Sequence, residues 1–209
     1  MNRIKQTIIA LAIGLSLANC GDDFLDTTSS DQMSDSNTFT TIDGAQQVLT
    51  GAYDWLTNGW LAHMTNQYIF FLPDIMGDDA LVTPDDPWKG CYSIIDNTNA
   101  ILDNIGNLAE SAERNRIEGE ALSLRAYTYH FLVRMYAKPV NKYPDNPSII
   151  LRISSGTEDL PRATVKDVYN QLVVDMEKAC GLLDQHSSSS KAYIGANAAH
   201  GILARLYLD

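Results

Sequence analysis

The stretch of residues 112–137 constrains the fold more than any other part of this sequence. Its apolar residues recur at three- and four-residue spacing in two separate stripes, so two sides of one helix are apolar. One stripe holds Ile117, Ala121, Leu124, Phe131 and Met135, and the other holds Leu122, Ala126, Tyr129, Val133 and Tyr136. A helix that is apolar on two sides is usually buried between neighbours. The sequence therefore predicts a central helix packed between other helices.

Apolar spacing of the same kind predicts helices before and after this one. They are expected over residues 41–57, 88–108, 164–183 and 195–208, with a shorter one at 61–72. Thr164 and Asp167 have the spacing of a capping-box variant, which marks a helix start. Residues 139–161 are expected to form a loop or a weak hairpin, with 149–151 as the only strand-like run. The predicted fold class is all-α, with irregular loops between the helices.

A short pattern in the sequence occurs twice. The run Leu-Val-Arg-Met-Tyr at residues 132–136 returns as Leu-Ala-Arg-Leu-Tyr at 203–207, which is 71 residues later. Each copy closes the second helix of a predicted pair, as stacked helical hairpins of the tetratricopeptide kind would produce. The apolar pattern continues to Asp209 without a terminating Gly or Pro, so we expect this sequence to be part of a longer protein.

The first twenty residues have the features of a secretory signal. Arg3 and Lys5 precede an apolar run at residues 8–18, which is too short to span a bilayer as a helix. The following Leu-Ala-Asn-Cys resembles a lipobox, so residues 1–19 are predicted to be a lipoprotein signal peptide. Cys20 would then carry a diacylglycerol and an N-acyl chain such as palmitate, enough for stable anchoring. The alternative is an ordinary cleaved signal that leaves Cys20 as a free thiol.

The two other cysteines are Cys91 and Cys180, and each falls on the apolar side of a predicted helix. Two buried thiols are the favoured interpretation, although export would permit a disulfide between them. Residues 20–40 are rich in Ser, Thr and Asp and are expected to form a tether. The helical domain is expected to occupy residues 41–209.

The charge of the chain excludes one class of partner. Without Arg3 and Lys5, 13 basic residues remain against 26 acidic ones, a formal net charge of −13. Nucleic-acid binding depends largely on neutralising phosphates with Lys and Arg, so no nucleic acid is expected. An anionic membrane surface is excluded as a partner for the same reason, and the lipid would have to provide the anchoring.

No arrangement of residues typical of catalysis occurs in the sequence. It lacks a Gly-x-Ser-x-Gly motif, a phosphate-binding glycine loop and a His-Glu-x-x-His motif, so neither an enzyme nor a cofactor is predicted. The four histidines are scattered, as in packing or surface roles. Asp74, Asp78 and Asp79 could in principle bind Ca²⁺. Their spacing misses the EF-hand pattern, so a solvated acidic loop is favoured and no metal site is predicted.

Several segments together resemble the N-terminal region of SusD/RagB proteins, the nutrient-binding lipoproteins of Gram-negative outer membranes. One segment is Cys-Gly-Asp-Asp-Phe-Leu-Asp at residues 20–26, and another is the spaced Tyr92, Ile95 and Asn99. The most specific is Gly-Glu-Ala-Leu-Ser-Leu-Arg-Ala-Tyr-Thr-Tyr at 119–129, followed by the run at 132–136. Leu-Pro-Arg-Ala-Thr-Val at 160–165 and the run at 203–208 complete the set, which extends over essentially the whole mature chain.

The resemblance implies a mostly α fold of tetratricopeptide-like helix pairs and display on the cell exterior. It also implies capture of glycans, or sometimes peptides, and their delivery to a SusC-like TonB-dependent transporter. The acidic pair Asp22 and Asp23 resembles the export tag of such surface lipoproteins. Members usually have several hundred residues, so this chain would supply only the N-terminal part. A competing hypothesis is a tetratricopeptide-type scaffold that binds a protein and no nutrient; nothing specific supports a third, a glycoside hydrolase.

Aromatic residues are the candidates for stacking against sugar rings, whose C–H faces pack on aromatic planes. Trp55, Trp88 and Tyr92 fall on apolar helix faces and are expected in the core. Trp60 and Tyr68 lie in an irregular region, where binding residues concentrate, and are the predicted ligand contacts.

Three polar residues on the apolar helices are given structural roles. Arg125 and Arg134 are each expected to form a salt bridge with an acidic neighbour. Asn99 is expected to hydrogen-bond a backbone group rather than a ligand.

Overall fold

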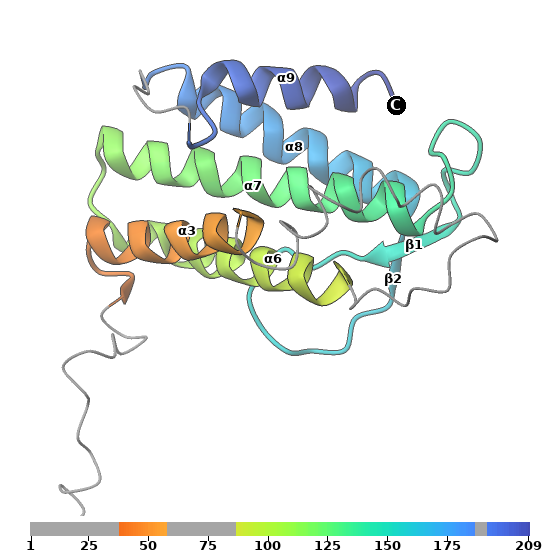
Figure 1. Cartoon of the computed structure of the whole chain (residues 1–209), viewed down its shortest axis with the longest axis horizontal. Helices are drawn as coiled ribbons and strands as arrows, with labels where there is room; N and C mark the ends of the chain where they lie inside the picture. The colour runs from red at the N-terminus through yellow and green to blue at the C-terminus, as the bar shows by residue number, and fades with distance from the viewer. Residues whose placement is uncertain (1–37, 58–86, 187–191) are drawn as a thin grey trace, which may run out of the picture. The chain divides into compact units, whose positions relative to one another are not determined.

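Helices dominate the computed structural model, which describes residues 38–57, 87–186 and 192–209. These residues belong to a unit that extends from Ser36 to Asp209. Successive helices run in alternating directions and pack side by side (Figure 1). They are α3 (Ile42–Thr57), α6 (Pro87–Asn104), α7 (Ala112–Tyr136), α8 (Val165–Leu183) and α9 (Ala196–Leu206). The mostly helical fold predicted from the sequence is confirmed.

Helix α7 is the central element, and it contacts α3, α6, α8 and α9. Every residue from Ile117 to Ala126 is buried, because neighbouring helices cover more than one side of α7. The helix begins at a cap in which Ser111 Oγ accepts the N–H of Arg114 at 3.1 Å, so one of the free N–H groups of the first turn is satisfied. The prediction that two apolar sides place this helix between neighbours is confirmed.

Helices α7 and α8 approach each other closely at Gly119. A Cβ atom at this position would lie 2.8 Å from Cγ of Leu183 and 3.3 Å from Cβ of Leu182. Both distances are shorter than ordinary van der Waals contact. The missing side chain therefore allows the two helices to pack at this distance.

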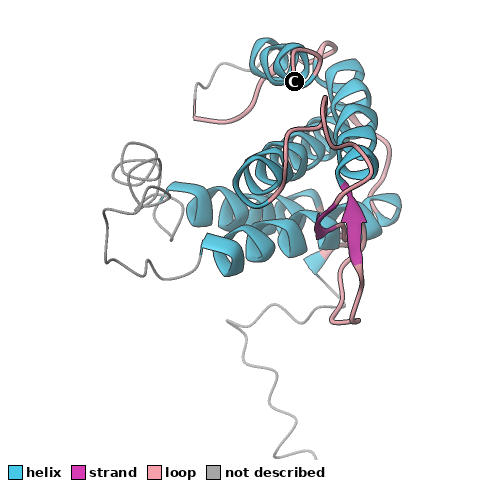
Figure 2. Cartoon of the chain, turned by 90° about the vertical axis from the view of Figure 1, so that its right-hand side faces the viewer, coloured by secondary structure: helices cyan, strands magenta, loops and turns pink. Residues whose placement is uncertain are grey.

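The start of α8 is fixed by the cap that the sequence predicts. Thr164 Oγ1 accepts the N–H of Asp167 at 3.1 Å and donates to Oδ2 of the same residue at 2.7 Å. The weak hairpin expected over residues 139–161 is confirmed only in part. Strand β1 (Pro147–Ile150) lies within that range and pairs antiparallel with β2 (Arg162–Thr164), which lies just beyond it, at the end of the bundle where α8 begins (Figures 1 and 2). The second strand has three residues, too few for an alternating pattern, so the sequence did not reveal it.

Two helix ends differ from the expected ones. Helix α6 stops at Asn104 and continues as a 3₁₀ turn, η3 (Ile105–Asn107), in which Leu108 N–H donates to the Ile105 carbonyl at 3.2 Å. Such tightening of the last turn satisfies carbonyl groups that an α-helix leaves free at its end. Helix α9 ends at Leu206, two residues before the expected end.

The two cysteines of the helical unit are buried, and no disulfide joins them. Cys91 lies on α6 and Cys180 on α8, so the favoured interpretation of two buried thiols is confirmed. Within the described ranges, no helix has the length and apolar character needed to cross a membrane.

Candidate functional site

A buried ion pair joins α7 to α8 at the middle of the bundle. Arg125 Nε donates to Asp175 Oδ2 at 2.8 Å, and its Nη2 donates to Oδ1 at 2.7 Å. The remaining nitrogen, Nη1, donates to Asn99 Oδ1 at 2.8 Å and to the Ile153 carbonyl at 3.2 Å. Arg125 is 5% exposed and Asp175 2%. All three guanidinium nitrogens thus have acceptors, and the salt bridge predicted for Arg125 is confirmed.

The same network holds the irregular segment that follows β1. Asn99 Nδ2 donates to the carbonyls of Arg152 and Ser154, each at 3.1 Å. Tyr129 OH donates to the Arg152 carbonyl and accepts the Arg152 N–H, both at 2.7 Å. Burial raises the pKa of Tyr129 to about 12, so its proton remains available for this hydrogen bond at neutral pH. The backbone role predicted for Asn99 is confirmed.

This network has no group left over for a ligand. The donors of Arg125 and Asn99 bond to protein acceptors, and Tyr92 OH donates to the Ile150 carbonyl at 2.6 Å. Further along the segment, Asp103 Oδ2 accepts both the N–H and the hydroxyl of Ser155 at 2.8 Å. We therefore assign the network a structural role, which is to fix residues 150–155 against α6 and α7.

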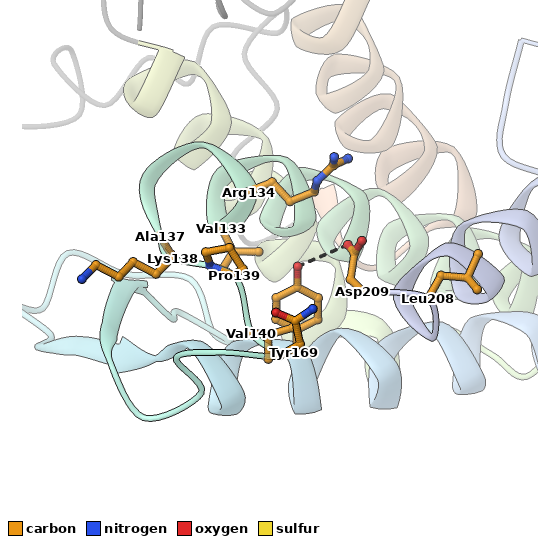
Figure 3. Close-up of a pocket in the computed structure, with 10 residues that line it drawn as sticks. Val133, Arg134, Ala137, Lys138, Pro139, Val140, Tyr169, Leu208 and Asp209 are labelled. Carbon is orange, nitrogen blue, oxygen red and sulfur yellow. Dashed lines mark hydrogen bonds between the residues drawn. The ribbon is translucent and has the colours of Figure 1, made fainter. Parts of the chain in front are cut away.

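A pocket of about 250 Å³ lies at the C-terminal end of α7 (Figure 3). Its walls come from the last turn of α7, the loop at residues 137–141, Tyr169 of α8 and the residues after α9. The apolar part of the lining is Val133, Ala137, Pro139, Val140 and Leu208, and the polar part is Arg134, Lys138, Asn141, Tyr169 and Asp209. Half of the lining residues are polar, so this cavity is more polar than the mostly apolar pockets that usually hold small ligands.

Asp209 connects two aromatic side chains at the rim of this pocket. Its Oδ2 atom lies 2.6 Å from His130 Nε2. The same atom accepts the hydroxyl of Tyr169 at 3.3 Å (Figure 3). Burial lowers the pKa of His130 below its usual value, so the imidazole is neutral at pH 7. Burial by itself would raise the pKa of Asp209, but the His130 hydrogen bond and the charge of Arg134 lower it. The carboxylate is therefore ionised and already bonded to protein donors.

The structure contradicts the salt bridge that was expected for Arg134. Its side chain is exposed, and it forms no ion pair or hydrogen bond with any described residue. The predicted salt bridge is absent because the last turn of α7 leaves this side chain at the rim of the pocket, more than 4 Å from any described carboxylate. Nearby, Lys138 Nζ lies 4.8 Å from the centroid of the Tyr143 ring, a cation–π distance.

The sequence already shows that the part of the chain around Arg134 and Lys138 is basic. Residues 121–144 contain four Arg and Lys residues and no Asp or Glu, although the chain as a whole has 26 acidic residues. The total charge of the chain hides this local reversal.

Three residues predicted as sites from the sequence lie outside the described residues and stay predictions: Cys20, Trp60 and Tyr68. The acidic loop with Asp74, Asp78 and Asp79, for which no metal site is predicted, also lies outside them. No group of three His, Cys, Asp or Glu side chains that could hold a metal occurs within the described ranges.

The tryptophans expected in the core behave differently from each other. Trp88 and Tyr92 are half-buried and pack against the core, and the Trp88 ring lies 4.9 Å from that of Tyr92 and 5.1 Å from that of Tyr136. Trp55 is 39% exposed, so its placement in the core was wrong. Its spacing fits the apolar stripe of α3, but more than a third of the residue is exposed.

Comparisons with known proteins agree with this architecture. A model of the SusD-like family, described as "Starch-binding associating with outer membrane", matches residues 17–208. Among solved structures, a SusD-like carbohydrate binding protein from Bacteroides vulgatus is 26% identical with a TM-score of 0.66, over 80% of this chain and 41% of that one. A SusD superfamily protein from Bacteroides thetaiotaomicron is 28% identical with a TM-score of 0.64, over 80% and 42%.

A curated relative gives a similar result over a shorter region. SusD-like protein P2 of Formosa agariphila is 27% identical over 124 residues, which are 58% of this chain and 23% of that protein. The chain thus spans about two fifths of the length of the two solved structures and less than a quarter of the curated relative.

Proposed function

We propose that this chain, which belongs to the SusD-like family, forms the N-terminal scaffold of a carbohydrate-binding protein at the outer membrane. The observation that carries the proposal is the family match, which extends over residues 17–208. The structural similarity to a protein named as carbohydrate binding supports it, since 80% of the chain is covered at 26% identity. Family members are binding proteins rather than enzymes, so no reaction is assigned to the chain.

The proposed partner is a SusC-like TonB-dependent transporter that receives the bound glycan. Stacked helical hairpins offer broad surfaces to protein partners, and this chain consists largely of such hairpins. We further propose that the protein faces the cell exterior, with Asp22 and Asp23 behind the anchor as its export tag. Purification of the tagged protein from outer membranes should recover the transporter, and its absence would contradict this part of the proposal.

Replacing Cys20 with Ala is expected to abolish membrane anchoring, because Cys20 is the proposed lipid attachment site. At least two acyl chains are needed for stable anchoring, and this variant would have none. Membrane fractionation should find Cys20→Ala in the soluble fraction or as uncut precursor. Cys180→Ala keeps the lipid site and should stay with the membrane. A Cys20→Ala protein that was processed and remained membrane-bound would show that the anchor is elsewhere.

Glycan binding is expected to require more of the protein than this chain. The proposed contacts Trp60 and Tyr68 are two residues, whereas the solved relatives are more than twice as long as the matched region. A glycan array that includes starch, followed by calorimetry on the hits, should give weak binding by the longer gene product and little by this chain. Equal affinity for both, lost in Trp60→Ala, would place the whole site here. Partner capture without glycan binding by either protein would favour a scaffold function instead.

A further inference from the structure

A buried carboxyl group lies in the first half of α7, the helix that also contacts α3. Glu120 is 2% exposed, and its Oε1 atom accepts a hydrogen bond from Arg116 Nη1 at 2.8 Å. Its Oε2 atom is buried and has no hydrogen-bond partner among the described residues. Burying a polar oxygen without a donor is unfavourable, and the cost is greater when the group is charged. Half of this carboxylate is therefore unsatisfied.

Arg116 is shared between two carboxylates, so its charge does not balance both. Its Nε donates to Glu113 Oε2 at 2.8 Å, and its Nη2 donates to Gln46 Oε1 at 2.6 Å. No other Lys, Arg or His of the described residues lies within 4.0 Å of the Glu120 carboxylate. Glu113, Arg116 and Glu120 together carry one negative charge in excess when both carboxyl groups are ionised. A single proton would balance the group.

Two further titratable side chains act on Glu120 from other elements. Tyr53 of α3 is buried and interacts with the Glu120 carboxyl group. Burial, and then the charge of Glu120, raise the pKa of Tyr53, so its hydroxyl keeps its proton. His186 follows α8 and is half-buried, and its positive charge when protonated would favour the ionised form of Glu120. Glu120 and His186 are therefore the two alternative places for the balancing proton.

Tyr53 also connects this group to a segment distant in the chain. Its hydroxyl accepts the N–H of Ile194 at 3.0 Å, and its ring lies 5.0 Å from the ring of Tyr193 in an edge-to-face arrangement. Both residues precede α9, whereas Tyr53 belongs to α3. A change of charge at Glu120 therefore acts directly on the contact between α3 and the segment before α9.

Burial favours Glu120 over His186 as the place for the proton. It raises the pKa of Glu120 above the ordinary value, although the hydrogen bond and the charge of Arg116 oppose the rise. A carboxyl group whose pKa is higher in the folded chain than in the unfolded chain binds its proton more tightly when the chain is folded. Its contribution to stability is complete below the unfolded pKa and is lost as the pH rises through the folded pKa.

We propose that Glu120 is a proton-binding site through which mild acid strengthens the packing of α3 and of the Tyr193–Ile194 segment on α7. The proton removes the excess negative charge, and Arg116 keeps its ion pair with Glu113. A protein on the cell exterior, as proposed above, meets the pH of the surroundings. The scaffold would then become more stable when those surroundings turn acidic, whatever ligand the protein carries.

The first test is a carbon-13 NMR titration of the whole chain. The Glu120 Cδ signal is assigned by its loss in Glu120→Gln. We expect the Glu120 carboxyl group to titrate at a higher pH in the folded chain than in the same chain unfolded in urea. Titration at the same pH in both states, or at a lower pH in the folded chain, would overturn the proposal without any need for a variant that folds.

Urea unfolding at about pH 5 and about pH 8 is the second test, in which the unmodified chain is compared with Glu120→Gln. The stability advantage of the unmodified chain over the variant should be larger at the lower pH. Groups such as His130 are present in both proteins and cancel in the difference. The two tests must agree, since a pKa one unit higher in the folded chain corresponds to about a tenfold gain in the folding equilibrium constant. An advantage that is equal at both pH values, or larger at the higher one, would contradict the proposal.

Glu118→Gln is the matched control for the unfolding experiment. Glu118 is also buried on α7, but its Oε1 atom is paired with Lys178 Nζ at 2.6 Å, and this lysine has no second carboxylate within 4.0 Å among the described residues. The stability advantage of the unmodified chain over this variant should not grow in acid. Growth as large as that seen with Glu120→Gln would mean that any buried carboxyl group of α7 gives the effect, and it would overturn the assignment to Glu120.

Amide hydrogen exchange at Ile194 reports on the contact itself. Its protection factor, which corrects for the intrinsic effect of pH on exchange, should be higher at about pH 5 than at about pH 8 in the unmodified chain. The protection factor should lose this dependence on pH in Glu120→Gln. A dependence that survived in Glu120→Gln and disappeared in His186→Asn would identify the imidazole as the proton site and refute the role of Glu120.

Discussion

Arg125→Met is expected to lower the free energy of unfolding by about 3–5 kcal/mol, the usual cost of removing one partner of a buried ion pair. Asp175 is 2% exposed, and its buried carboxyl group would lose the guanidinium that pairs with it. Asn99 Oδ1 and the Ile153 carbonyl would lose their donor as well. Urea unfolding followed by circular dichroism measures the effect.

Arg134→Met is the matched control, because it makes the same substitution on the same helix at an exposed residue without an ion pair among the described residues. Its effect should stay within about 0.5 kcal/mol. The double variant Arg125→Met with Asp175→Leu should be more stable than Arg125→Met alone, because no buried charge is left unpaired. If Arg125→Met fails to fold, this double variant still tests the argument. An Arg125→Met protein as stable as the Arg134→Met protein would contradict the structural role of the pair.

Gly119→Val is expected to destabilise the protein by about 1–3 kcal/mol through overpacking between α7 and α8. The new Cβ would lie 2.8 Å from Cγ and 3.0 Å from Cδ2 of Leu183, and the branched side chain needs still more room. The higher helix propensity of Val over Gly opposes this cost only in part, since it is worth less than about 1 kcal/mol.

Gly201→Val on α9 makes the same change where a Cβ would meet nothing within 4 Å. This control isolates the propensity difference, and it should stabilise the protein by a few tenths of a kcal/mol. Thermal unfolding of the two variants should therefore shift the midpoint in opposite directions. A Gly119→Val protein at least as stable as the unmodified chain would show that the helices separate without cost.

Several features could be predicted from the sequence because their cause is local. The two apolar stripes of α7 follow from the spacing of its own residues, and so does its central position. The cap of α8 depends on Thr164 and Asp167, which are three residues apart and already close before any tertiary contact forms. The family resemblance came from the same kind of evidence, since its motifs lie within single helices and their caps.

The candidate site could not be predicted from local spacing in the same way. Trp60 and Tyr68 stay predictions, because they lie outside the described residues. The pocket at the end of α7 escaped notice because its walls come from segments far apart in the chain, such as Val133, Tyr169 and Asp209. The spacing of residues within one helix does not indicate which distant segments will contact each other. Strand β2 is a similar case, since its three residues form a strand only by pairing with β1.

Arg125 and Arg134 show which properties follow from the sequence alone and which depend on the tertiary structure. The sequence alone determined that both lie on one long helix and, being nine residues or about two and a half turns apart, point to opposite sides of it. Both sides were apolar enough to be buried, so the same salt-bridge role was expected for each. Only the packing of α8, which brings Asp175 to the middle of α7, gave Arg125 a partner and left Arg134 exposed. The physical reason is that a helix fixes the direction of its own side chains, whereas the charge and solvent that they meet depend on residues distant in the chain.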